Sequence, residues 1–259
     1  TQVAAPLVLD STEPEVMQAG LELIGGRSVL NSANLEDGDG SGSRLDRVLR
    51  LAREHGAAVI CLLIDERGQA RDLEWKMEVA HRLYDIAVNR YGLDSSDLIF
   101  DPLTFPLTTG DADLRGDAIA TIAAIGRIKV ELPDVHTILG VSTVSFGLKP
   151  AARHVLTSMF LHECVANGLD AAIIHAGRII PLNKISDEHK RLCLDLIYDR
   201  GSNDYDPLTR LIEEFTGVTV AGAADTIDRS DWPVGYRLRQ RIIDGNMTGL
   251  ETDLAEALD

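Results

Sequence analysis

Polar side chains follow several short apolar segments of the chain, at the point where each segment ends. Asp10 and Asn31 follow the first two of these segments, and Asp101 follows a later one. An ionised carboxylate only accepts hydrogen bonds, whereas an asparagine side chain both donates and accepts them. Two carboxylates and one amide on one rim would match the edge of a flat heterocycle such as a pterin. Each residue taken alone is equally well explained as the cap of a following helix.

Three further groups of residues stand at similar positions. The segment Gly140-Val-Ser-Thr-Val-Ser-Phe-Gly147 would let a ligand approach the backbone closely, although a tight turn with Ser and Thr bonded to local backbone groups explains it too. Asp65-Glu-Arg-Gly68 pairs two carboxylates, which suits acid–base chemistry, but such a run is more often a solvated turn. His175 has no second histidine at the spacing of a zinc site, so we expect no metal.

These side chains are carried by a repeated unit of strand, loop and helix. The expected strands are rich in Val, Ile and Leu without strict polar alternation, which indicates a parallel sheet that is buried on both faces. They are Leu7–Asp10, Ser28–Asn31, Ala58–Asp65, Leu98–Asp101, Thr137–Ser142 and Ala171–His175. The expected helices are Glu13–Ile24, Ser43–His55, Asp72–Tyr91, Asp113–Glu131, Pro150–Asn167, Asp187–Tyr198 and Asp206–Thr216.

The strand ends favour a barrel over a doubly wound sheet. A doubly wound sheet would normally carry a glycine-rich phosphate turn after its first strand, and the sequence has none there. In a (β/α)8 TIM-type barrel the strand ends converge on one mouth, where the active site is built. The residues expected at that mouth are Asp10, Asn31, Asp65, Asp101, Ser142 and His175.

The pattern predicts six strands where a closed barrel has eight. Because the chain begins almost directly on a strand and without Met, we expect a barrel that lacks its first two strand–helix units. We place this barrel at residues 1–220. A polar linker, Gly217–Asp231, and a helix pair, Trp232–Asp244 and Thr248–Leu258, would make up a second part at 221–259.

Composition narrows the classes of function. The formal net charge of −16 argues against a nucleic-acid partner, because binding a phosphate backbone requires clustered Lys and Arg. No apolar run reaches transmembrane length and no signal peptide is evident, so we expect no membrane partner. The three cysteines, Cys61, Cys164 and Cys193, are widely spaced in apolar contexts, which predicts buried free thiols and a cytoplasmic protein.

Taken together, the motifs resemble the folate domain of cobalamin-dependent methionine synthase, a methyltransferase. Their order and spacing agree with that family from Asp10 to about Phe215. The matching segments are Pro6-Leu-Val-Leu-Asp-Ser11, Val29-Leu-Asn-Ser32, Asp65-Glu-Arg-Gly-Gln-Ala70, Ile99-Phe-Asp-Pro102, Gly140–Gly147 and Gly168-Leu-Asp-Ala-Ala-Ile-Ile-His-Ala176.

The resemblance implies a barrel that binds 5-methyltetrahydrofolate at its mouth, with Asp10, Asn31 and Asp101 holding the pterin ring. Gly140, Ser142, Asp65 and His175 are further candidate substrate-binding residues. The methyl group would pass to cob(I)alamin on another module of the same polypeptide and then to homocysteine on a third. The terminal helix pair resembles the start of the cap that precedes the family's cobalamin-binding domain.

One position departs from the family pattern. The family motif usually reads Gly-Val-Ser-Asn, and its Asn bonds the pterin near the nitrogen that carries the methyl group. Thr143 stands in place of that Asn here and is our candidate catalytic residue. Two alternatives stay open: a methyltransferase for a corrinoid protein outside methionine synthesis, and a pterin-binding module without catalysis.

Overall fold

The protein is described by a computed structural model that covers residues 5–111, 114–217, 231–244 and 249–258. The chain divides into two compact units, Thr1–Val218 and Thr219–Asp259. The predicted boundary at 220/221, most of the predicted linker and the Gly245-Asn-Met-Thr248 connection lie outside the described residues.

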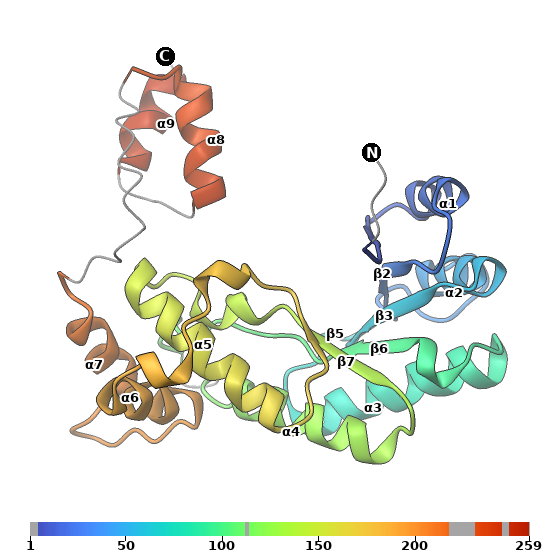
Figure 1. The fold of residues 1–259 in the computed structure, drawn as a ribbon, viewed down its shortest axis with the longest axis horizontal. Coiled ribbons are helices and arrows are strands. Elements are labelled where there is room, and N and C mark those ends of the chain that lie inside the picture. The colour runs from blue at the N-terminus through green and yellow to red at the C-terminus, as the bar shows by residue number, and fades with distance from the viewer. Residues whose placement is uncertain (1–4, 112–113, 218–230, 245–248, 259) are drawn as a thin grey trace. The chain divides into compact units, whose positions relative to one another are not determined.

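The first unit is built on a curled sheet of six parallel strands, each paired with the next one along the chain (Figure 1). The sheet has the consecutive strand order of a (β/α)8 barrel, and the described residues contribute six strands to it where a closed barrel has eight. The predicted fold, a partial TIM-type barrel, is thus confirmed. The strands are β1 (Val8–Asp10), β2 (Val29–Ala33), β3 (Ala58–Leu62), β6 (Leu98–Asp101), β7 (His136–Leu139) and β8 (Ala171–Ala172).

Helices connect the strands and cover one face of the sheet. Right-handed crossovers between parallel strands that always advance in one direction place every connecting helix on the same face. Neighbouring helices are in contact, as α1 is with α2 and as α4 is with both α3 and α5. The helices are α1 (Pro14–Leu23), α2 (Arg44–His55), α3 (Leu73–Asp85), which continues as the π-helical turn η1 (Ile86–Arg90), α4 (Asp117–Glu131) and α5 (Pro150–Ala166).

Local signals set the helix ends. The Ser43 hydroxyl accepts a hydrogen bond from the Asp46 N–H at the start of α2, and Gly56 ends that helix with a left-handed φ of 63°. The Asp72 carboxylate likewise accepts from the Trp75 N–H and begins α3. Both helices therefore start where the capping pattern in the sequence predicts.

The expected third strand is shorter than predicted. β3 ends at Leu62, and the next residues turn into an antiparallel hairpin of β4 (Ile64–Asp65) and β5 (Gly68–Gln69). Asp65 is therefore not at the end of a strand of the main sheet, and that prediction is wrong. The apolar residues continue past the end of β3 because Leu63 is fully buried. Apolar residues indicate burial, but they do not show where strand pairing ends.

The last two strands of the sheet also end earlier than predicted. β7 ends at Leu139, and Val141–Ser145 forms the 3-10 helix η4. Ser142 therefore lies on that short helix and not at a strand end. β8 ends at Ala172, and His175 precedes a second 3-10 helix, η5 (Ala176–Arg178). Both polar residues follow the carboxyl ends of their strands by three residues.

The first unit also contains the 3-10 turns η2 (Ser95–Asp97) and η6 (Leu182–Lys184) and the helices α6 (Asp187–Ile197) and α7 (Pro207–Glu214). The three cysteines are free and buried, as predicted. Among the described residues, no helix has the length and apolar character needed to cross a membrane.

The second unit contains the predicted helix pair, α8 (Val234–Asp244) and α9 (Leu250–Leu258), which are in contact with each other. Asp253 on α9 is 5% exposed and pairs with two arginines of α8, Arg237 at 2.9 Å and Arg241 at 2.5 Å. These two ion pairs of a buried carboxylate link α9 to α8.

Candidate functional site

Asp10, Asn31 and Asp101 lie on the same face of the sheet. Successive side chains of a strand point to opposite faces. The residue before each of the three packs in the core between the sheet and the helices; these residues are Leu9, Leu30 and Phe100. The three polar side chains therefore point to the inner face of the sheet, away from the helices. The strand register agrees, because Leu9 pairs with Leu30 and Asp10 with Asn31.

The register also shows how far apart the three residues are. Asp10 and Asn31 are partners on adjacent strands, which lie about 4.8 Å apart. Asn31 pairs with Ile60, and Ile60 pairs with Ile99, so Asp101 lies two strands away and two residues further along. That separation is roughly 12 Å on a flat sheet, and curling toward the inner face shortens it. The structure therefore brings the three residues to one rim. The prediction that Asn31 ends its strand is wrong, because β2 continues past it to Ala33.

Asp101 is the most buried of the three, at 8% exposure. Its Oδ1 accepts a hydrogen bond of 2.8 Å from the N–H of Leu103, which has a left-handed φ of 65°. Burial raises the pKa of Asp101 to about 6, although backbone hydrogen bonds from Leu103 and Gly140 and the charge of Lys76 act in the opposite direction. Asp101 is thus a carboxylate held in a fixed orientation, with its charged form disfavoured by its surroundings.

Asp10 and Asn31 keep their side chains available. Asp10 is exposed and Asn31 is half-buried. Neither side chain makes a hydrogen bond to any other described residue, and both residues take part in the strand pairing through their backbones. Asp10 is therefore not a helix cap, since α1 starts at Pro14 without a side-chain cap. Both side chains can bind a ligand without first breaking an internal bond.

Gly140 and the η4 residues extend the same rim beyond β7. Gly140 is half-buried, whereas Ser142 and Thr143 are exposed. A Cβ added at Gly140 would meet no protein atom within 4 Å, so the fold itself does not require glycine there. η4 is held in place by a 3.0 Å hydrogen bond from the N–H of Leu107 to the Val144 carbonyl. The Thr143 side chain makes no hydrogen bond within the described part of the chain.

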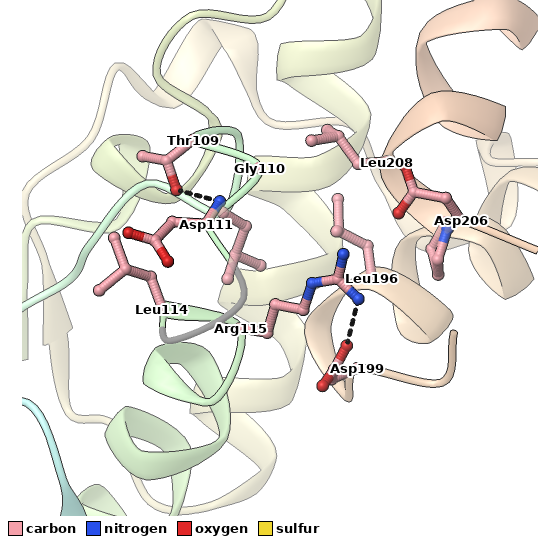
Figure 2. A pocket seen from close by; sticks show the side chains of 11 residues that line it. Thr109, Gly110, Asp111, Leu114, Arg115, Leu196, Asp199, Asp206 and Leu208 are labelled. Carbon is pink, nitrogen blue, oxygen red and sulfur yellow. Dashed lines mark hydrogen bonds and ion pairs between the residues drawn. The ribbon is translucent and has the colours of Figure 1, made fainter. Parts of the chain in front are cut away.

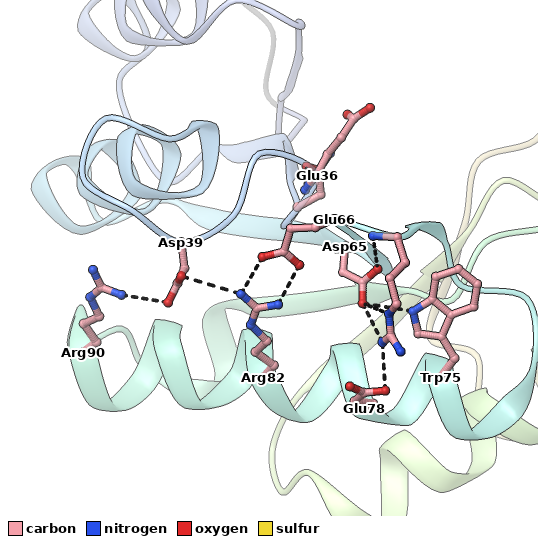
Figure 3. A network of polar contacts seen from close by, with 10 residues as sticks. Glu36, Asp39, Asp65, Glu66, Trp75, Glu78, Arg82 and Arg90 are labelled. Carbon is pink, nitrogen blue, oxygen red and sulfur yellow. Dashed lines mark hydrogen bonds and ion pairs between the residues drawn. The ribbon is translucent and has the colours of Figure 1, made fainter.

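Asp65 belongs to a different network (Figure 3). Its Oδ2 accepts hydrogen bonds from Arg67 at 2.7 and 2.9 Å and from the Trp75 indole at 3.0 Å. Burial raises the pKa of Asp65, but the bonds from Arg67 and Trp75 outweigh it and hold the pKa below its usual range. Arg67 also pairs with Glu78 of α3 at 2.8 Å. Asp65 thus fastens the β4–β5 hairpin to α3, and the structure does not group it with Asp10, Asn31 and Asp101.

His175 is separated from the rim residues of the first strands. β8 is the edge of the sheet opposite β1. The imidazole is exposed, and the residue's backbone carbonyl accepts from the Arg178 N–H at 2.9 Å within η5. The structure therefore places His175 beyond the carboxyl end of the last strand and gives it no link to the other candidates.

Lys76 is a further residue near the site that the sequence patterns did not predict. This residue is fully buried on α3, and its ammonium donates to the carbonyl of Pro102, directly after Asp101, at 2.5 Å. The available signal was its position, because Lys76 shares a helical face with the core residues Ala80 and Leu83. A charged residue at a core-facing helical position is rarely buried unless its charge is compensated.

A separate pocket lies between the β6–α4 loop and the helices α6 and α7 (Figure 2). Arg115 crosses it to Asp199, with 3.8 Å between their charged groups. None of the predicted site residues lines this pocket. Within the described residues, no group of three or more His, Cys, Asp or Glu side chains is arranged to hold a metal ion.

Comparison with known proteins identifies relatives of the chain. Residues 1–175 match the family described as "Pterin binding enzyme". Over its full length the chain is 49% identical to "Methionine synthase" of Mycobacterium tuberculosis (strain ATCC 25618 / H37Rv) and covers 22% of that protein. Over 98% of its length it is 50% identical to "Methionine synthase" of Mycobacterium leprae (strain TN), of which it covers 21%. The chain thus spans about a fifth of the length of these relatives.

Proposed function

We propose that this chain, which belongs to the pterin-binding enzyme family, is the module of a cobalamin-dependent methionine synthase that binds 5-methyltetrahydrofolate and presents its methyl group for transfer. The observation that carries the proposal is the position of Asp10, Asn31 and Asp101 on the inner face of one sheet, where Asp10 and Asp101 end β1 and β6 and Asn31 pairs with Asp10 from within β2.

The donor and acceptor groups of the rim fit a reduced pterin. The 2-amino group and ring N–H of a pterin are donors, and an ionised carboxylate such as Asp101 can accept both. Because Leu103 already orients the Asp101 carboxylate, little side-chain entropy is lost when the ligand binds. The rest of the pterin edge carries both hydrogen-bond donors and acceptors. Asn31 can pair with either kind of group, and Asp10 lies beside it.

The chemistry that this chain must assist is the breaking of a bond between a methyl carbon and a tertiary amine. That amine is a poor leaving group unless it gains a proton or a strong hydrogen bond. Thr143 is proposed to supply that hydrogen bond, since its hydroxyl is exposed at the rim and unused within the described chain. Cobalamin, held by another module, would supply the nucleophile, and homocysteine would bind a third module. The remaining task of this module is alignment of the methyl group, which can lower a barrier by several kcal/mol.

The test is the Thr143→Asn variant in the full-length protein. Asn is the residue that the family motif usually has at this position. Its side chain is longer than that of Thr, so its amide can come closer to the nitrogen that carries the methyl group. If Thr143 makes only a weak bond, the variant gains about 1–3 kcal/mol of transition-state stabilisation. Methyl transfer from 5-methyltetrahydrofolate to free cob(I)alamin should then accelerate by about 5- to 150-fold.

Thr143→Val is the matched control, because it keeps the branched shape and removes only the hydroxyl. We expect it to slow methyl transfer and to leave the dissociation constant of the folate nearly unchanged. Equal rates for the wild type and both variants would refute the role of Thr143. Tight folate binding with no methyl transfer in any of the three proteins would instead favour a pterin-binding module without catalysis.

A further inference from the structure

Lys76 is the largest side chain of the described structure that is fully buried. Its ammonium donates to two backbone carbonyls, Ala70 at 2.8 Å and Pro102 at 2.5 Å. It also lies 5.2 Å from the centre of the Phe105 ring, a favourable cation–π distance. Burying an ammonium without an ion-pair partner is expensive, so its persistence in the core calls for a compensating role.

The Pro102 carbonyl, which accepts a hydrogen bond from Lys76, belongs to the turn that orients Asp101. Pro102 and Leu103 follow Asp101 directly, and the Leu103 N–H donates to the carboxylate. The Thr121 hydroxyl of α4 holds the same turn from another side, by a 2.8 Å bond to the Leu103 carbonyl. Lys76 and Thr121 are therefore two anchors of one turn, and only one of them is charged.

Lys76 also lies among other charges. Asp101 and Asp117 face it and raise its pKa, as does Asp72, whereas Arg71 lowers it. Burial is the largest influence and lowers the pKa of Lys76 to about 8, so the side chain is still charged at neutral pH. Asp117 is also paired with Arg71 at 2.5 Å.

We propose that Lys76 is a positioning residue of the pterin site: its buried ammonium anchors the turn that carries Asp101 and sets a positive charge beside the Asp101 carboxylate. The proposal rests on the proposed function, because it assumes that Asp101 binds the pterin. It assigns a second task to a group that otherwise serves only as a backbone anchor. Lys76 acts through Asp101 and does not touch the ligand.

The test is the pH dependence of ligand binding in the full-length protein. The dissociation constant of 5-methyltetrahydrofolate is measured by calorimetry between pH 5 and pH 8 for the wild type and for Lys76→Met. In the wild type, binding should weaken below the pKa of Asp101, about 6, as the carboxylate takes up a proton. Without the charge of Lys76, this weakening should begin at a pH about one unit higher, which is about tenfold weaker binding at a fixed pH on the acidic side.

Thr121→Val is the matched control, since it releases the same turn without changing any charge. It should alter binding equally at all pH values, with the acidic midpoint unmoved. Lys76→Arg should keep the wild-type midpoint. An acidic midpoint that stays in place in Lys76→Met would show that Lys76 is only a structural anchor and would overturn the proposal.

A further variant keeps the proposal testable if Lys76→Met does not fold. Lys76→Gln keeps hydrogen-bond donors at this position and removes the charge, so it should raise the acidic midpoint as Lys76→Met does. A midpoint that is unchanged or lowered in Lys76→Gln would count against the proposal. Failure of the wild type to bind the folate at any pH would instead reject the proposed function.

Discussion

The substitution Asp101→Asn should weaken ligand binding and stabilise the fold at the same time. Burial raises the pKa of Asp101 from 3.8 to about 6. A shift of about two units means that the folded protein at neutral pH carries roughly 3 kcal/mol of unfavourable free energy for holding this carboxylate ionised. Asn keeps an oxygen that can accept from Leu103 and has no charge to desolvate. We therefore expect the variant to gain about 1–3 kcal/mol of unfolding free energy at pH 7.5.

The gain should depend on pH with a defined sign. Because the folded pKa is raised, the protonated form of Asp101 favours the fold fully below pH 3.8, and this contribution is lost as the pH rises through about 6. In Asp101→Asn this side chain has no carboxyl group to ionise, so its contribution to stability does not fall as the pH rises. The stability difference between variant and wild type should consequently be small near pH 4 and largest above pH 6.

Binding should change in the opposite direction. A hydrogen bond to a charged group contributes about 1.5–3 kcal/mol, so the dissociation constant of 5-methyltetrahydrofolate should rise by about 10- to 150-fold at pH 7.5. Calorimetry measures the binding. Hydrogen exchange of the β6 backbone in the full-length protein, corrected for intrinsic rates at each pH, measures the stability. Unchanged binding together with a pH-independent loss of stability would refute the reasoning, since Asp101 would then be an ordinary structural carboxylate.

Two other substitutions separate ligand contacts from structural ones. Gly140→Ala should leave stability unchanged or raise it by up to about 1 kcal/mol, because the φ of −77° at Gly140 suits alanine and no protein atom lies close to the added carbon. Folate binding, measured by calorimetry, should weaken. Unchanged binding would exclude a close approach of the ligand at this glycine. Asp65→Asn should lower the thermal melting temperature, because it breaks hydrogen bonds to Arg67 and Trp75. The folate dissociation constant should stay the same. A large increase in that constant would show that Asp65 belongs to the binding site after all.

The order of the elements could be predicted from the sequence because each one carries its own signal. Capping residues and the 3.6-residue period place α2 and α3, and short apolar segments place β2 and β6. The ends of β3 and β7 could not be predicted. Apolar residues report burial, and Leu63 and Val141 are buried in a hairpin and a 3-10 helix after their strands have ended.

The grouping of three candidate residues could be predicted because strand geometry alone decides it. The two-residue period of a strand is enough to put Asp10, Asn31 and Asp101 on one face once the residues before them are taken as core. The role of Asp65 could not be predicted from the sequence, because its partners depend on the tertiary fold. Arg67 bonds it across a hairpin, and Trp75 bonds it from α3. Lys76 was missed for a similar reason: its ammonium bonds backbone carbonyls, which no residue pattern records.

A crystal structure of the full-length protein with 5-methyltetrahydrofolate bound would show directly which residues hold the pterin. We expect the pterin edge to lie within hydrogen-bond distance of the Asp101 carboxylate and of Asp10 or Asn31, with the methyl-bearing nitrogen turned toward Thr143. A folate bound in the pocket beside Arg115, or anywhere that leaves Asp101 without a ligand contact, would contradict this expectation.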